Sequence, residues 1–402
     1  MTVRHVVQSS TVETLLIFLR LGLTSFGGPI AHLGYFRTEF VERRRWMTEA
    51  AYADLVALCQ FLPGPASSQT GFAIGLMRGG WTGAMAAWIG FTLPSALAMV
   101  LFAYGAAGLD SGIGAGVIAG LKVLAVAIVA HAVLGMGQSL CRGRARISIM
   151  LAAMVLLALW PSAVAQILVI VMGGLLGLLI LRDTNEPSHA TNRPQTPRGH
   201  PVLIFVALGL LALTPVLASL GIGGHAVAVF DAFYRAGALV FGGGHVVLPL
   251  LESAVVDPGW VTPEDFLAGY GAAQAVPGPL FTFAAYLGAA DMQGTSGILT
   301  AAIALVAIFL PGCLLVAGTL PLWDRLRAWK GARAVLAGVN AAVVGILALA
   351  LYDPVFTAGI RDPLHVTLAT AAFLALQVFR SPVWAVVISM ALAGGLRAAL
   401  GI

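Results

Sequence analysis

The stretch FLRLGLTSFGG, residues 18–28, returns as FYRAGALVFGG at residues 233–243. Both copies read Phe-x-Arg-x-Gly-x-x-x-Phe-Gly-Gly, so an arginine precedes a glycine pair by the same distance in each. Apolar residues surround both copies. Glycine weakens a helix and permits backbone conformations that other residues avoid. The repeat therefore predicts two related halves, each containing a helix that is broken close to a positive charge.

The composition is that of a membrane protein. Of 402 residues, 59% are hydrophobic and only 10% are charged, whereas soluble proteins average about 25% charged residues. Only helices and closed barrels satisfy their backbone in lipid, and the apolar runs here lack the alternation of a barrel strand. We therefore expect an all-α polytopic membrane protein. Runs of spanning length lie at 81–108, 112–139, 147–181, 201–220, 296–320, 334–352 and 364–400.

Several other classes of protein are disfavoured. The net charge of +5 resides in short loops between apolar runs, which is typical of topology signals and does not indicate a nucleic-acid partner. Cys59, Cys141 and Cys313 are scattered, so neither a disulfide framework nor a metal site is expected. Phosphate-loop, zinc-peptidase and nucleophile-elbow motifs do not occur in the spans. We expect no enzyme activity and no cofactor.

Further landmarks recur in the same order in both halves, at spacings of 214 to 218 residues. Such an internal duplication is common in secondary transporters. It divides the chain into an N-terminal repeat (1–181), a polar linker (182–200), a linking transmembrane helix (201–222) and a C-terminal repeat (223–402). The matching landmarks are Trp46 with Trp260, Pro63-Gly64-Pro65 with Pro277-Gly278-Pro279, Leu93-Pro94 with Leu310-Pro311, and Gly120 with Gly338.

Loop charges predict that the two repeats are inverted. The loop at 37–46 carries four arginines, whereas its counterpart at 252–265 has no basic residue. Further on the pattern reverses, because 108–112 has no basic residue and 323–333 has four. Basic loops stay on the cytoplasmic side, so equivalent loops are expected on opposite faces of the membrane.

The inversion requires that the helices around each break enter and leave on one face. Segment 11–27 has 17 residues, about 25 Å of helix, which is short for a hydrocarbon core of about 30 Å. We therefore expect re-entrant hairpins at the Phe-Gly-Gly and Pro-Gly-Pro units. The alternative is that 11–27 spans outright and the linking helix does not.

The breaks also suggest an anion site. A half-helix begins beyond each break, and its free N–H groups attract anions; intramembrane cations add to this, and arginine suits oxyanions. The alternatives are helix capping at the breaks and arginines that reach to the interface. The expected substrate-binding residues are Arg20, Gly27, Gly28, Pro63, Gly64, Pro65, Ser67, Ser68, Gln69, Lys122, Arg235, Gly242, Gly243, Pro277, Gly278, Pro279 and Thr282.

Four short stretches of the first half resemble the chromate ion transporter family: SFGGP (25–29), VERRRW (41–46), LPGP (62–65) and the glycine-rich run after it. The linked halves resemble its long-chain, two-domain members. This resemblance implies a multi-pass protein of the bacterial inner membrane that exports chromate and confers chromate resistance. It carries over to Gly27, Gly28, Pro29, Trp46, Pro63, Gly64 and Pro65. The second half departs from it, with Gly244 in place of Pro29.

Three functions remain open at this point. An exporter of chromate and an importer of a related oxyanion, such as a sulfate permease, would have the same residues. An intramembrane enzyme is the third, and lacks a recognisable catalytic set. The expected partners are chromate, sulfate as a competing oxyanion, the lipid bilayer and, in a homodimer, a second copy of the chain; nucleic acid is not expected.

Overall fold

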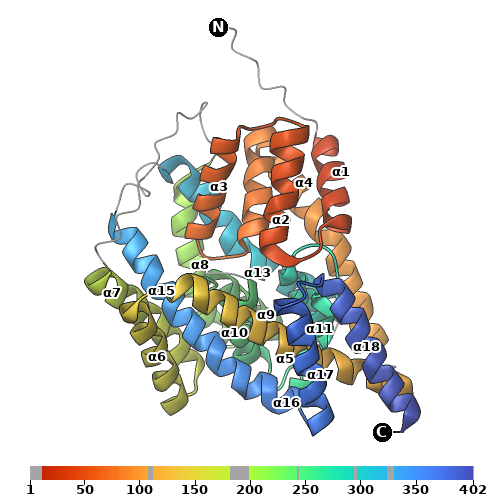
Figure 1. Cartoon of the computed structure of the whole chain (residues 1–402). Helices are drawn as coiled ribbons and strands as arrows, with labels where there is room; N and C mark the ends of the chain where they lie inside the picture. Colours follow the sequence, from red (N-terminus) through yellow and green to blue (C-terminus); the bar gives the residue numbers. More distant parts are fainter. Residues whose placement is uncertain are drawn as a thin grey trace.

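The computed structural model of the chain describes residues 11–106, 112–181, 199–241, 244–293, 297–323 and 330–401. Within these residues every regular element is a helix (Figure 1). Six described helices are long and apolar enough to cross a membrane. The predicted class, an all-α polytopic membrane protein, is confirmed.

The two halves repeat one order of helices, with the predicted breaks between helices. The first half comprises α1 (Thr11–Thr24), α2 (Gly28–Arg37), the π-helical turn η1 (Thr38–Arg43), α3 (Glu49–Phe61), α4 (Ala66–Ala106), α5 (Gly112–Leu140), α6 (Arg144–Leu159) and α7 (Ala163–Ile180). The second comprises α8 (Val202–Ser219), α9 (Gly224–Ala238), η2 (Gly244–Val246), α10 (Val247–Val255), α11 (Pro263–Ala273), η3 (Leu280–Thr282), α12 (Phe283–Ala289), α13 (Gly297–Thr319), η4 (Leu320–Leu322), α15 (Lys330–Ala350), η5 (Leu351–Phe356), α16 (Thr357–Gly359), α17 (Pro363–Gln377) and α18 (Val383–Leu400).

Helix α4 contains a reversal of the chain. Gly80 has φ 65° and ψ −152°, a conformation accessible mainly to glycine. A Cβ atom added to Gly75 would lie 2.4 Å from the carbonyl oxygen of Gly83, although residues eight apart in a continuous helix are separated by about 12 Å. The segments before and after Gly80 therefore pack against each other, and the second arm corresponds to the predicted run 81–108.

The helices beside the first glycine pair are too short to cross a membrane alone. Helix α1 has 14 residues, α2 has 10 and α3 has 13, which at 1.5 Å per residue gives about 15–21 Å. A hydrocarbon core is about 30 Å thick. The prediction that helices are broken here is confirmed. The opposite membrane orientation of the two halves stays a prediction.

The two halves interlock through their long helices. Helices α6 and α7 of the first half pack on α15 of the second, while α17 and α18 of the second pack on α5 of the first (Figure 1). Glycines allow both contacts to be close. A Cβ atom on Gly338 of α15 would lie 2.0 Å from the carbonyl oxygen of Gly173, and one on Gly394 would lie 3.0 Å from Cα of Gly120. Since Gly120 and Gly338 are equivalent positions, each half uses the same glycine for a close contact with a helix of the other half.

The basic loop after α2 is held by ion pairs. Glu39, which is buried, accepts hydrogen bonds from Arg43 at 2.9 Å and Arg44 at 2.6 Å. The guanidinium of Arg78, near the reversal in α4, lies 4.6 Å from the ring centroid of Trp46. The run VERRRW therefore holds the segment after α2 against Glu39 and against α4, in addition to its predicted topological role.

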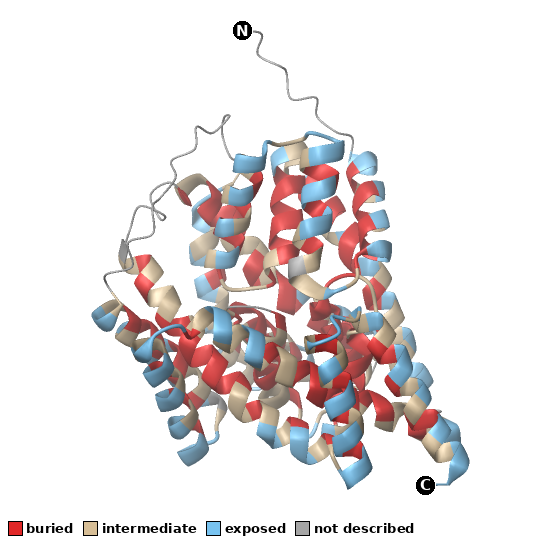
Figure 2. Cartoon of the chain, in the orientation of Figure 1, coloured by how far each residue is buried: buried red, intermediate tan, exposed pale blue. Residues whose placement is uncertain are grey.

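Buried residues concentrate at the centre of the molecule and exposed residues at its outside (Figure 2), and many of the exposed residues are large and apolar. Leu159, Phe205 and Leu101 are 79%, 73% and 71% exposed, as expected for surfaces that face lipid. Helix α8 lies in the predicted linking segment 201–222, and 182–198 of the predicted linker lie outside the described residues. The proposed domain boundaries stay a prediction.

Candidate functional site

The breaks of one half meet the breaks of the other. The backbone N–H of Gly64, in the first Pro-Gly-Pro, donates to the carbonyl of Val240 at 2.8 Å. The backbone N–H of Gly278, in the second, donates to the carbonyl of Ser25 at 2.9 Å. Gly64 and Gly278 are equivalent, as are Ser25 and Val240. The two hydrogen bonds are therefore a reciprocal pair, and we call this region the crossing.

Two glycines make the crossing possible. Gly64 has φ 120° and Gly278 has φ 102°, values that other residues rarely adopt. A Cβ atom on Gly64 would lie 3.1 Å from Cα of Gly312, and one on Gly278 would lie 2.8 Å from Oγ of Ser95. Ser95 and Gly312 are again equivalent positions, so each Pro-Gly-Pro packs against the long helix of the opposite half in the same way.

The glycine pairs approach each other as well. Gly27 and Gly28 have φ 99° and 77°; Gly27 is the N-cap of α2, and Gly28 is its first residue. A Cβ atom on Gly244 would lie 3.3 Å from Cγ of Pro29. Because Pro29 and Gly244 are equivalent positions, this contact joins the same point of the two halves. Gly242 and Gly243, two of the expected site residues, lie outside the described residues.

Helix α4 brings polar side chains into the crossing. It begins at Ala66, as predicted, and Ser67, Ser68 and Gln69 in its first turn are buried. Nε2 of Gln69 donates to the carbonyl of Pro63 at 2.9 Å and to that of Gly312 at 3.2 Å. The amide thus ties the first Pro-Gly-Pro to the opposite half, and the two serines remain beside it.

A histidine joins these hydroxyls. Nδ1 of His32 on α2 lies 3.4 Å from Oγ of Ser67, and its ring lies beside the backbone of Ser25. Several buried polar atoms here have no hydrogen-bond partner among the described residues. An unpaired buried polar atom costs about 1–3 kcal/mol, so these are the groups that a polar ligand could stabilise. They are Oγ of Ser25, Nε2 of His32, Oγ of Ser68, Oε1 of Gln69 and Oγ1 of Thr92.

The second half contributes fewer polar groups. The hydroxyl of Thr282, directly after Pro279, donates to the carbonyl of that proline at 2.8 Å. Nε2 of Gln274, before Pro277, is buried and unpaired among the described residues. The polar lining is therefore asymmetric although the backbone is not.

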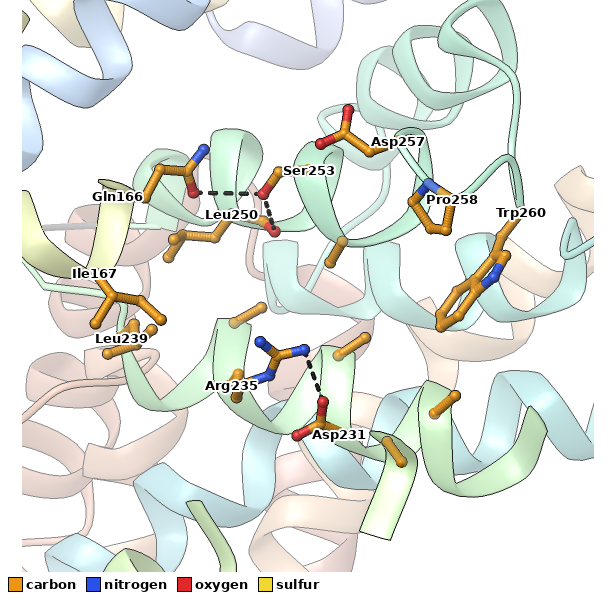
Figure 3. A pocket seen from close by; sticks show the side chains of 15 residues that line it. Gln166, Ile167, Asp231, Arg235, Leu239, Leu250, Ser253, Asp257, Pro258 and Trp260 are labelled. Atoms are coloured by element: carbon orange, nitrogen blue, oxygen red, sulfur yellow. Dashed lines mark hydrogen bonds and ion pairs between the residues drawn. The ribbon is translucent and has the colours of Figure 1, made fainter. Parts of the chain in front are cut away.

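Arg235 lies in a separate cavity of about 450 Å³ between α7, α8, α9 and α10 (Figure 3). Its Nη2 lies 2.7 Å from Oδ2 of Asp231, one turn earlier on α9. Ser253 and Gln166 lie on the opposite wall, where Oγ of Ser253 donates to Oε1 of Gln166 at 3.4 Å. Asp231 was not among the residues expected from the sequence, although the i,i+4 spacing in DAFYR is a signal of an ion pair.

The other two expected cations are placed differently. The Arg20 side chain is exposed, although it occupies the position equivalent to Arg235. Lys122 on α5 is half-buried and lies within electrostatic reach of Glu264, Asp265 and Arg361. The structure therefore brings together the breaks and the first turn of α4, while the three cations lie in three different surroundings. Their part in substrate binding stays a prediction.

Sequence comparison adds independent information. The family model for chromate transporters matches residues 12–178 and again 227–395. A probable chromate transport protein of Synechococcus elongatus is 30% identical over 338 residues, 82% of this chain and 81% of the relative. A chromate transport protein of Pseudomonas aeruginosa is 29% identical over 350 residues, 84% and 79% of the two chains. No solved structure matches the chain.

The two matched regions correspond to the two repeated halves of the fold. Together with the apolar helices they identify a multi-pass protein of the bacterial inner membrane. The recurring motifs, the broken helices and the family match agree: this chain belongs to the chromate transporter family.

Proposed function

We propose that the protein is a secondary transporter that exports chromate across the inner membrane and so confers chromate resistance. The observation that carries this proposal is the reciprocal pair of hydrogen bonds at the crossing, from Gly64 to Val240 and from Gly278 to Ser25. It joins the start of a helix from one half to the broken helix of the other at one point of the molecule.

The chemistry of the crossing suits a tetrahedral dianion. The first turn of a helix offers backbone N–H groups and the positive end of the helix dipole. Ser67 and Ser68 add hydroxyl donors, and neither is more than 4% exposed. In a low-dielectric surrounding, such donors stabilise an anion more than they would in water.

The symmetry of the crossing suits alternating access. In a transporter with repeated halves, one half rocks against the other around a fixed site. Two equivalent hydrogen bonds, each linking the halves, can open in turn as the halves move. Arg235 in its cavity beside the broken helix α9 would attract the anion on one side of this movement.

Direction and selectivity need a flux measurement. In everted membrane vesicles, radiolabelled chromate should accumulate when the protein is present, because the vesicle interior corresponds to the cell exterior. Excess sulfate tests whether the related oxyanion competes, and ionophores test the driving force. Absence of chromate accumulation beyond that of empty-vector vesicles would refute export.

The crossing is tested by a double variant, Ser67→Ala with Ser68→Ala. A hydrogen bond to a charged group contributes about 1.5–3 kcal/mol, so the half-saturating chromate concentration should rise more than tenfold. The control is Ser139→Ala with Ser389→Ala, because both serines are exposed and their hydroxyls donate to backbone carbonyls one turn earlier in the same helix. An unchanged half-saturating chromate concentration in the first double variant would show that these hydroxyls only cap the helix.

A further inference from the structure

An ion pair within one helix occupies the wall of the 450 Å³ cavity. Asp231 and Arg235 are one turn apart on α9, and their Oδ2 and Nη2 atoms are 2.7 Å apart (Figure 3). The carboxylate is the buried member, with 3% of its side chain exposed against 36% for the arginine. The arginine therefore faces the cavity while its partner lies behind it.

Both members have a second feature that concerns ligand binding. Oδ1 of Asp231 accepts a hydrogen bond of 2.7 Å from the hydroxyl of Thr214 on α8. Nε of Arg235 is buried and has no partner among the described residues. The carboxylate is thus held from behind, and the guanidinium retains a free donor for the planar, two-pronged contact that oxyanions accept.

Few other charges face this pair. Helices α7, α8 and α13, which pack around α9 or line the cavity, carry no Asp, Glu, Lys, Arg or His within their described ranges. Helix α10 carries Glu252, and Asp257 lies in the segment after it, on the cavity wall. At the start of α9, His225 is paired with Asp291. Asp231 therefore relies on Arg235 for charge compensation.

We propose that Asp231 is a tethered competitor for the anion on Arg235: an oxyanion entering the cavity takes its place, and the released carboxylate takes up one proton from solvent. This rests on the proposed function and deepens it. The pair of Arg235⁺ and Asp231⁻, plus a dianion and one proton, becomes the anion on Arg235⁺ and a neutral Asp231. A buried carboxylate that has lost its cation is destabilised, and protonation removes that cost.

The proton has a route to the carboxylate. A second cavity of about 210 Å³ shares Gln166, Ser253 and Asp257 with the first and is also lined by Glu252 and Asp353. Carboxylates and hydroxyls along adjoining cavities are groups that can relay a proton.

The arrangement of Asp231, Arg235 and Thr214 is confined to the second half. The position equivalent to Asp231 is Leu16, which is 58% exposed, and Arg20 therefore has no carboxylate one turn before it. Thr214 is supplied by α8, and no described helix of the first half occupies the equivalent place before α1. One proton per anion follows from this asymmetry.

The test measures chromate binding to the purified protein by calorimetry in two buffers of different ionisation enthalpy. The wild-type protein should take up about one proton per chromate, and its affinity should fall by up to tenfold per pH unit while Asp231 changes its protonation state on binding. In Asp231→Asn the uptake should vanish, and binding at high pH should become at least tenfold tighter because the competitor is gone. Protonation of chromate itself is common to all variants and cancels in the comparison.

Thr214→Val keeps the carboxylate but removes the hydrogen bond that stabilises its ionised form. The pH range over which the affinity falls should then move upward relative to the wild type. This variant decides the question if Asp231→Asn does not fold. Glu49→Gln, which removes a carboxylate from the exposed pair with Arg37, is the control and should match the wild type.

The outcomes separate the two proposals. Wild-type protein that binds chromate without proton uptake, or variants that retain the wild-type pH dependence, would overturn the inference and leave the transport proposal standing. Weaker binding at every pH in Asp231→Asn would likewise assign the pair a purely structural role. Wild-type protein that neither binds nor moves chromate would refute the proposed function.

Discussion

Replacing Gly64 by alanine should destabilise the protein through the crossing. A left-handed backbone conformation costs an alanine about 1–2 kcal/mol, and Gly64 has φ 120°. The new Cβ atom would lie 3.0 Å from Nε2 of Gln69 and 3.1 Å from Cα of Gly312. Overpacking of this kind adds about 1–3 kcal/mol. The free energy of unfolding should therefore fall by about 2–5 kcal/mol.

Two other glycines provide graded controls. Gly221 also has a positive φ, 69°, but a Cβ atom there has no neighbour within 4 Å, so Gly221→Ala should cost only about 1–2 kcal/mol. Gly278→Ala should lie between the two, because its nearest neighbour is the Ser95 hydroxyl at 2.8 Å, a side chain that can move.

The assay is unfolding by sodium dodecyl sulfate in mixed micelles, followed by circular dichroism, with chromate flux measured on the same variants. The expected order of destabilisation is Gly64→Ala, then Gly278→Ala, then Gly221→Ala. A Gly64→Ala variant as stable as Gly221→Ala would refute the close packing of the Pro-Gly-Pro against the opposite half.

Three further predictions concern charge, assembly and topology. Arg235→Gln should lower chromate efflux about tenfold or more because it removes the cation of the cavity, whereas Arg20→Gln should have a smaller effect because that side chain is exposed; equal losses in vesicle flux would contradict this distinction. Gly338→Ala should reduce the yield of folded protein in size-exclusion chromatography, since its Cβ atom would lie 2.0 Å from the backbone of α7; a normal yield would argue against the interlocked halves. Single cysteines at the exposed Ala50 and Pro258, in a cysteine-free background, should react with impermeant reagents from opposite faces of the membrane; labelling from one face would refute the inversion.

The fold class and the breaks could be predicted because they are local properties. Apolar runs, glycine pairs and Pro-Gly-Pro units are written in adjacent residues, and where the structure describes them each corresponds to a helix or a break. The start of α4 at Ala66 followed from the proline that precedes it. The partner of Gly64 could not be read in this way. Its hydrogen bond reaches Val240 in the other half, and no local pattern specifies which break meets which.

The two arginines show where the repeat misleads. Both lie in the pattern Phe-x-Arg-x-Gly-x-x-x-Phe-Gly-Gly, and equal roles were the natural prediction. The difference begins within the repeat, because Asp231 of the second half is replaced by Leu16 in the first. Thr214 of α8 also donates to Asp231, whereas Arg20 has no carboxylate one turn earlier and is exposed. A duplicated motif predicts equivalent backbone more safely than equivalent chemistry.

That asymmetry has a consequence for transport. If two inverted halves were identical, exchanging their conformations would convert the inward-open state into an equally stable outward-open state. Here the backbone of the crossing is reciprocal, but its buried hydroxyls are concentrated in α4, and the Asp231–Arg235 pair lies on α9 of the second half. If the halves are inverted and alternate in this way, we expect the two states to expose different polar groups to solvent and to differ in free energy. Substitutions in these groups should shift the population of the two states as well as the affinity for the anion, because a ligand or a charge that favours one state changes their ratio.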